Sequence, residues 1–234
     1  MIKRAAMAES GPERMYLNKY RELLESLDVW FRSIQTLYPD QILCKPGCAQ
    51  CCHGLFDVSL PDVLQVADAF SRLPAPMKIA VKDNASAIQM KILREHKELE
   101  FPYLLNANTP EKIDRIICSV QDVRCPFLDT RDTCLIYSHR PLACRLEGIP
   151  MVDVQDELFG DWCDLNFSKG ISPKVSQDLN LDYYKLQTIE LNASASIAQH
   201  FLAERREEVA VFVPSIVAGF EGYWSNVLSA WSGA

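Results

Sequence analysis

Four of the nine cysteines in this chain of 234 residues lie within nine positions, in the segment CKPGCAQCC from Cys44 to Cys52. Thiolates bind zinc and iron-sulfur clusters, and four of them complete a tetrahedral zinc site or one cubane cluster. Pro46, Gly47 and Gly54 permit tight turns, which let several sulfur atoms converge on one point. The segment therefore predicts a metal-binding loop.

A second group of cysteines follows in a stretch with poor periodicity, in the motifs RCPFLD, CLIY, RPLACR and WCDLNF. The eight candidate metal ligands are Cys44, Cys48, Cys51, Cys52, Cys125, Cys134, Cys144 and Cys163. Eight thiols make two sets of four, but the number alone does not assign the pairing. Cys51 and Cys52 are adjacent and project differently, so they could serve two sites, or one could bind while the other packs.

The spacing favours an iron-sulfur cluster, 4Fe–4S in type, over zinc. Zinc sites favour two-residue knuckles in pairs, and this chain has one such spacing, from Cys48 to Cys51. The compact first run and the Cys125-Pro126 pair are more typical of cluster loops. Zinc is the first alternative, and purely redox or structural thiols are the second.

Other residues near the cysteines receive simpler interpretations. Arg140 and Arg145 could offset the charge of a thiolate-bound centre or form surface salt bridges. Cys118, on the apolar face of a predicted helix, is expected to be a buried hydrophobic residue. The three Asn-x-Ser sequons, at Asn84, Asn166 and Asn192, would matter only after secretion, and we treat them as chance. We leave His53 and His139 out of the ligand set, because eight cysteines suffice.

The run Cys44-x3-Cys48-x2-Cys51-Cys52, followed by CPFLD, CLIY and RPLACR, resembles the YkgJ-type cysteine-cluster family over residues 40–170. Members of that family are described as zinc- or iron-chelating proteins. A relative, the flagellin lysine N-methylase, is similar in its cysteine region and is thought to combine an iron-sulfur cluster with S-adenosylmethionine. The resemblance implies metal chelation, and by analogy it raises a cluster-dependent protein methyltransferase as an alternative.

The first three cysteines also match the C-x3-C-x2-C spacing of radical S-adenosylmethionine enzymes. Such enzymes resemble partial or full α/β barrels. This sequence offers no succession of strands, because only residues 209–213 look strand-like. The architecture therefore argues against that class.

Hydrophobic periodicity predicts helices over residues 13–38, 60–73, from Met77 onward, from Pro110, over 178–208 and from Pro214 to 231. The predicted fold is all-α, with two irregular cysteine-rich metal-binding loops. We expect a single domain over residues 1–234. Its cysteine-cluster core spans 40–170, and helical segments flank it at 13–38 and 178–231.

Composition sets the remaining expectations. A hydrophobic content of 48% is typical of a folded protein, and a net charge of −7 argues against a nucleic-acid partner. No apolar run suits a signal peptide or a membrane span, so we expect no membrane association and a cytoplasmic location. A reducing compartment favours metal ligation over disulfides.

The leading hypothesis is a metal-binding protein that uses an iron-sulfur cluster, or zinc, in electron transfer or redox chemistry with an unknown redox or protein partner. No nucleophile–base pair or paired carboxylates lie beside the cysteines, so whether the chain is an enzyme stays open. One alternative is the methyltransferase. Another is a structural zinc module that presents the amphipathic segment from Pro214 to 231 to a partner.

Overall fold

A computed structural model describes residues 12–45, 47–97, 99, 103, 105, 108–120, 122–155, 157–202 and 210–218. The described part is mostly helical, as predicted, but it also contains two small sheets that the all-α prediction lacked. None of its helices is long and apolar enough to cross a membrane.

Eight α-helices account for most of the described residues. They are α1 (Pro12–Leu37), α2 (Leu60–Arg72), α3 (Ala75–Glu95), α4 (Pro110–Ser119), α5 (Leu142–Leu146), α6 (Pro173–Leu179), α7 (Tyr183–Leu202) and α8 (Val213–Ala218). The first four confirm the predicted helices. The helix predicted from Pro214 begins as α8, and its part beyond residue 218 lies outside the described residues.

The single helix predicted over 178–208 was wrong at its start, because the chain is extended between α6 and α7. Asn180 and Leu181 form a strand there, and the Asn180 side-chain amide donates to the Asp153 carbonyl oxygen at 2.9 Å. The Asp182 carboxylate then accepts the backbone N–H of Lys185 at 2.8 Å and caps the first turn of α7. These local bonds override the helical periodicity.

Both sheets are short. In the first, β1 (Asp57–Ser59) pairs antiparallel with β5 (Ala210–Phe212), which confirms the predicted strand at 209–213. In the second, the central strand β2 (Met151–Asp153) pairs antiparallel with β3 (Leu158–Phe159) and parallel with β4 (Asn180–Leu181). Strands of two or three residues are too short to show alternation, so the sequence did not reveal them.

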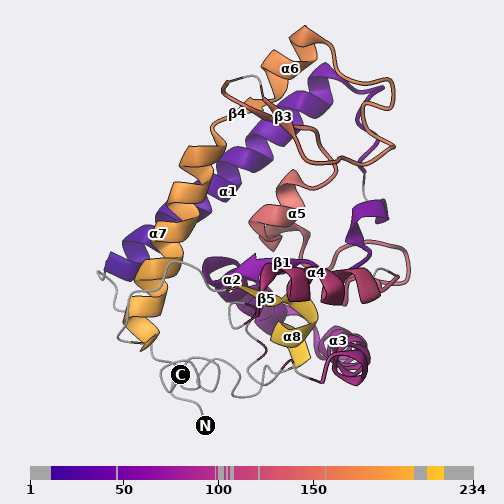
Figure 1. Ribbon diagram of the computed structural model, residues 1–234, viewed down its shortest axis with the longest axis vertical. Helices are drawn as coiled ribbons and strands as arrows, with labels where there is room; N and C mark the ends of the chain where they lie inside the picture. The colour runs from indigo at the N-terminus through magenta and orange to yellow at the C-terminus, as the bar shows by residue number, and fades with distance from the viewer. Residues whose placement is uncertain are drawn as a thin grey trace.

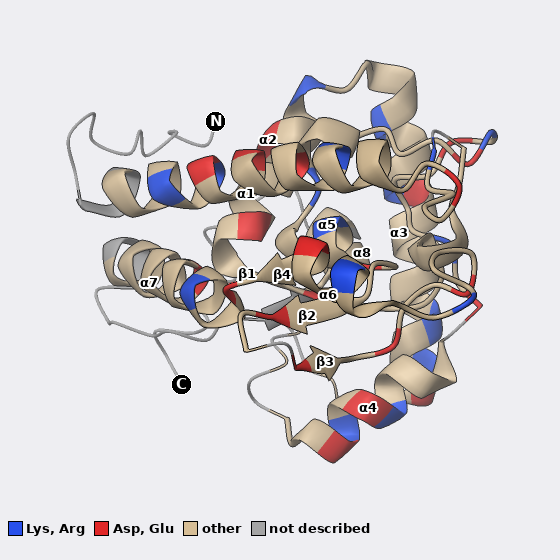
Figure 2. Ribbon diagram, turned by 90° about the horizontal axis from the view of Figure 1, so that it is seen from above, with Lys and Arg blue, Asp and Glu red and all other residues tan. Residues whose placement is uncertain are grey.

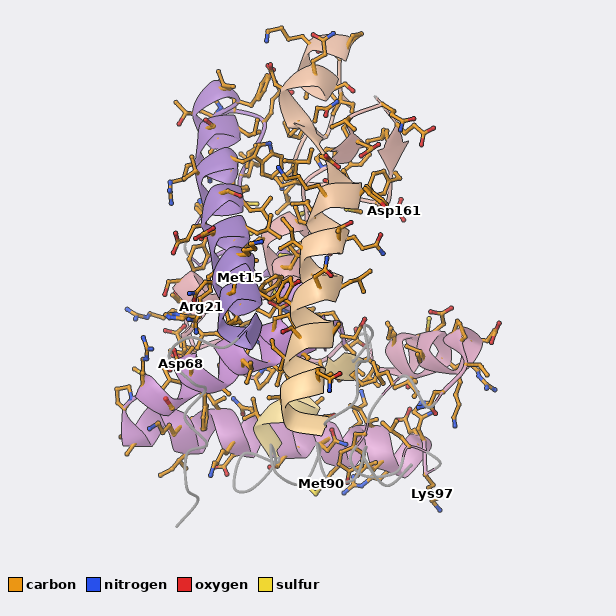
Figure 3. The ribbon with its side chains drawn as sticks, turned by 90° about the vertical axis from the view of Figure 1, so that its left-hand side faces the viewer. Met15, Arg21, Asp68, Met90, Lys97 and Asp161 are labelled. Carbon is orange, nitrogen blue, oxygen red and sulfur yellow. The ribbon has the colours of Figure 1, made fainter. Side chains whose placement is uncertain are left out.

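The two longest elements at the ends of the chain, α1 and α7, lie side by side (Figures 1 and 3). Their buried contact residues form one cluster with α5: Tyr20, Leu23, Leu24, Leu27, Leu142, Leu186 and Ala193. Each fully buried leucine contributes about 1.5–3 kcal/mol relative to exposure. The predicted apolar face of α1 thus provides the surface against which α5, the helix that carries Cys144, packs.

A second layer lies across the lower ends of this pair, where α3 runs roughly at right angles to α1 (Figure 3). Residues of α2, α3 and α8 share a core there, including Val66, Val81 and Ile216, and Cys125 and Cys134 pack against it. The neighbouring α4 buries Ile116 and carries interspersed acidic and basic residues on its outer face (Figure 2). Cys125 and Cys134 therefore pack against this second layer.

A buried carboxylate joins α1, α2 and α5. Asp62 of α2 accepts the Tyr20 hydroxyl at 2.8 Å, and its two oxygens accept the backbone N–H of Leu142 at 3.2 and 3.1 Å. Burial raises the pKa of Asp62 to about 7, against the opposing effect of the Tyr20 hydrogen bond. These bonds fix the first residue of α5, two positions before Cys144.

We predict that Tyr20→Phe lowers the free energy of unfolding by about 1–3 kcal/mol, because it leaves a buried carboxylate without one of its donors. Urea denaturation measures the change. Tyr184→Phe is the matched control, since Tyr184 is 79% exposed on α7. Equal stability of the two variants would contradict the role given to the buried carboxylate.

Candidate metal centre

The first cysteine segment follows α1 in the chain and forms two consecutive turns. The N–H of Cys48 donates to the carbonyl of Lys45, and the N–H of Cys52 donates to the carbonyl of Ala49, both at 2.9 Å. Gly47 adopts a φ of +86°, which residues with a Cβ rarely adopt. The Gln35 side chain of α1 donates to the carbonyl of Cys44 at 2.8 Å and fastens the segment to that helix.

Asn166 connects this segment to the last cysteine. Its side chain is fully buried, and its amide nitrogen donates to the Cys44 Sγ at 3.2 Å and to the Gly148 carbonyl at 2.7 Å. Its side-chain oxygen accepts the N–H of Leu43 at 2.9 Å, and its own N–H donates to the carbonyl of Cys163. One of these bonds reaches the Cys44 sulfur, and the others tie Asn166 to the backbone of Leu43, Gly148 and Cys163.

The electrostatic surroundings of Cys44 show which thiols lie near it. Burial raises the pKa of Cys44, the Asn166 hydrogen bond lowers it, and the sulfur atoms of Cys48, Cys51 and Cys163 raise it again. Neighbouring thiols act in this way because a second thiolate beside the first is repelled. We call Cys44, Cys48, Cys51 and Cys163 the Cys44 group.

A short antiparallel ladder brings Cys125 to the first segment. The N–H of Cys125 donates to the carbonyl of Cys52, and the N–H of Gly54 donates to the carbonyl of Val123, both at 2.8 Å. His53 and Arg124 face each other between these bonds. Residues about 70 positions apart in the sequence are thus held at backbone hydrogen-bond distance.

A tight hairpin and α5 supply the remaining thiols. The N–H of Leu135 donates to the carbonyl of Phe127 at 2.9 Å, which turns the chain back so that Cys134 approaches Cys125. Cys144 follows on α5, and not in an irregular loop as predicted, because Pro141 and Leu142 begin a short helix there. We call Cys52, Cys125, Cys134 and Cys144 the Cys125 group.

Three thiols of the Cys125 group, those of Cys125, Cys134 and Cys144, have raised pKa values, chiefly because they are buried. Burial raises the pKa of Cys125 to about 12, and Cys134 and Cys51 add to that effect. Burial also raises the pKa of Cys144 well above its ordinary value, with contributions from Cys125 and Cys134, whereas Arg140 lowers it. A bound cation would remove this penalty, because it replaces the thiol protons.

One cavity of about 430 Å³ connects the two groups, and seven of the eight candidate cysteines line it. Cys163 is outside that lining, although it acts on Cys44. Within the described residues, no three Cys, His, Asp or Glu side chains already stand close enough to hold a metal ion. Metal binding would therefore require the thiols to rotate inward.

Two arginines in the cavity wall fit a thiolate centre. Arg145 forms a pair of hydrogen bonds with Asp28 of α1 at 3.1 and 3.2 Å, and the Arg140 guanidinium lies 3.9 Å from the Tyr137 ring centroid. Within the described part of the chain, the Arg140 Nε and the Arg145 Nη1 are buried without a hydrogen-bond partner. Because buried N–H groups normally have acceptors, these two suit sulfur atoms that carry negative charge.

Besides the helical position of Cys144, the structure corrects the prediction for Cys118, and it adds residues that the sequence did not indicate. Cys118 is exposed on α4, and not buried, because the core face of that helix carries Ile116 and Val120. Asn166, dismissed as a chance sequon, is buried against Cys44. Its position three residues after Cys163 was the available signal. Asp62 lies about 80 residues from the helix that it holds, and its sequence context gave no signal.

Comparison with known families agrees with this site. The family model described as "Putative zinc- or iron-chelating domain", named CxxCxxCC, matches residues 43–164, about half of the chain. The chain belongs to this family, which confirms the predicted resemblance. All eight candidate cysteines lie inside the match, although three residues, and not two, separate Cys44 from Cys48. No curated protein and no solved structure matches the chain.

We predict that Asn166→Ala weakens metal retention, because the Cys44 sulfur loses its N–H donor and the Leu43 and Gly148 backbone groups lose their partner. Metal content per chain after dialysis against a chelator measures the effect. Asn84→Ala is the control, since Asn84 is an exposed sequon residue on α3. Equal retention in both variants would show that Asn166 does not support the site.

We also predict that thiol alkylation at pH 7 is fastest at Cys118 and slow at Cys125 and Cys144. The thiolate is the reactive form, so a raised pKa and burial both slow the reaction. Raising the pH toward the pKa of Cys125, about 12, should speed its modification. Mass spectrometry of iodoacetamide-treated protein measures the order, and early modification of Cys125 would contradict it.

Proposed function

We propose that this protein is an iron-sulfur protein with two cysteine-ligated centres, one at the Cys44 group and one at the Cys125 group, and that it transfers electrons. The observation that carries the proposal is the convergence of the eight thiols on one region, from segments that lie far apart in the sequence. Four thiolates are the ligand number of one cubane cluster.

Two features support iron-sulfur clusters over single zinc ions. A tetrahedral zinc site has Zn–S distances of about 2.3 Å and leaves little space inside it. The cavity here has about 430 Å³, and buried arginine N–H groups stand in its wall. Cluster sulfides provide additional acceptors for such donors, whereas a single zinc ion offers only its thiolates.

Electron transfer is supported by how the two groups meet. Cys51 and Cys52 are adjacent and their thiols are hydrogen-bonded, and Cys51 acts electrostatically on both Cys44 and Cys125, so this pair joins the two groups. Cys51 is exposed, which gives the Cys44 centre an edge at the surface where a redox partner could approach. The partner in this proposal is a protein that docks at that edge.

A structural zinc module is the second candidate, and one observation favours it. The ligands join segments that are distant in sequence, such as Cys44 and Cys163, so a metal would cross-link the fold. In that case zinc replaces iron and the protein is colourless. A cluster-dependent methyltransferase would instead bind S-adenosylmethionine tightly.

Purification under strict anaerobiosis, followed by iron, zinc and acid-labile sulfide analysis, tests the proposal. We predict a coloured protein with iron and sulfide in equal amounts. Cys48→Ser and Cys144→Ser should each remove about half of the iron, because each breaks one centre. Cys118→Ser is the control and should keep all of it. Stoichiometric zinc without iron would contradict the proposal and favour the structural module.

A further inference from the structure

We propose that Arg140 gives the Cys125 centre a higher reduction potential than the Cys44 centre, so that an electron entering the protein comes to rest at the Cys125 centre. The inference rests on the proposed function, since it assumes two iron-sulfur centres. Reduction adds negative charge, and a fixed cation in a poorly solvated wall stabilises that charge.

The wall beside the Cys125 group carries an excess of positive charge. Arg140 and Arg145 both line the cavity, and both approach the same carboxylate, Asp28. The distance from Asp28 is 3.1 Å to Arg145 but 3.9 Å to Arg140. One carboxylate cannot neutralise two guanidinium groups, so a positive charge remains, and the weaker pairing leaves most of it on Arg140.

Arg140 is held beside the cysteines that it would affect. Its guanidinium lies over the Tyr137 ring, and its Nη1 donates to the carbonyl of Cys144 at 3.4 Å. Only 19% of its side chain is exposed, so water screens it weakly. Its Nε has no partner within the described structure, and a cluster sulfur would supply the missing acceptor.

Asp62 is a buried carboxylate whose negative charge acts on Cys144 of the Cys125 group. It is already hydrogen-bonded to Tyr20 and to the N–H of Leu142. Because burial raises its pKa to about 7, it carries only part of a negative charge at neutral pH. Asp62 therefore offsets the arginine charge incompletely.

Among the residues that the structure describes, the Cys44 group has no buried cation comparable to Arg140. The Cys44 sulfur accepts a hydrogen bond from the neutral amide of Asn166. Lys45 and Glu147 line the same cavity, but both are exposed and their charges are opposite in sign. Water screens such groups, and their effects on the Cys44 centre oppose each other. The two centres thus differ by the buried charge of Arg140.

A redox titration of the anaerobically purified protein, followed by electron paramagnetic resonance, tests the inference. The wild type should show two midpoint potentials. Arg140→Gln should lower the higher potential and leave the lower one unchanged, whereas Arg140→Lys should keep most of the difference. Arg131→Gln is the control, since the Arg131 side chain is 84% exposed, and it should shift neither potential.

A second variant acts in the opposite direction. Asp28→Asn removes the carboxylate that the two arginines share and should raise the higher potential. If Arg140→Gln loses its cluster, this variant still tests whether the arginine charge sets that potential. Iron-loaded protein with one potential, or with potentials that these variants do not shift, overturns this inference and leaves the proposed function standing. Wild-type protein without iron overturns both.

Discussion

Thiolates in the two cysteine groups would repel one another, and this repulsion is the constraint on which the site depends. Burial and neighbouring sulfur atoms raise the pKa values of Cys44, Cys125 and Cys144. In a metal-free chain such thiols keep their protons. A metal centre replaces those protons with a cation, so the same crowding that disfavours thiolates favours a bound metal.

The helices supply what the cysteine segments lack, which is a rigid frame. Short turns and loops bury little apolar surface of their own, so their positions depend on bonds to longer elements. α1 provides Gln35 for the first segment and Asp28 for Arg145, while Asp62 of α2 holds the first residue of α5. Side chains of α1 and α2 therefore position cysteines that lie up to about 120 residues away in the sequence.

The sequence predicted most of the helices and the eight candidate ligands, because helical periodicity and cysteine spacing are local signals. It did not predict β2, β3 and β4, which form through pairing between distant segments. Cys118 was expected in the core, but a helix position two residues from Ile116 faces away from the buried face. Asn166 was given no role from the sequence but is buried against Cys44, because only the folded chain brings its amide to that sulfur.

The central claim is that cysteine sulfur atoms are the protein's ligands to its metal. X-ray absorption at the metal edge of the anaerobically purified protein tests this most directly, because the first coordination shell distinguishes sulfur from nitrogen and oxygen. We predict an iron edge, a first shell of sulfur alone at about 2.3 Å and an iron–iron shell beyond it. A first shell dominated by nitrogen or oxygen would contradict the claim.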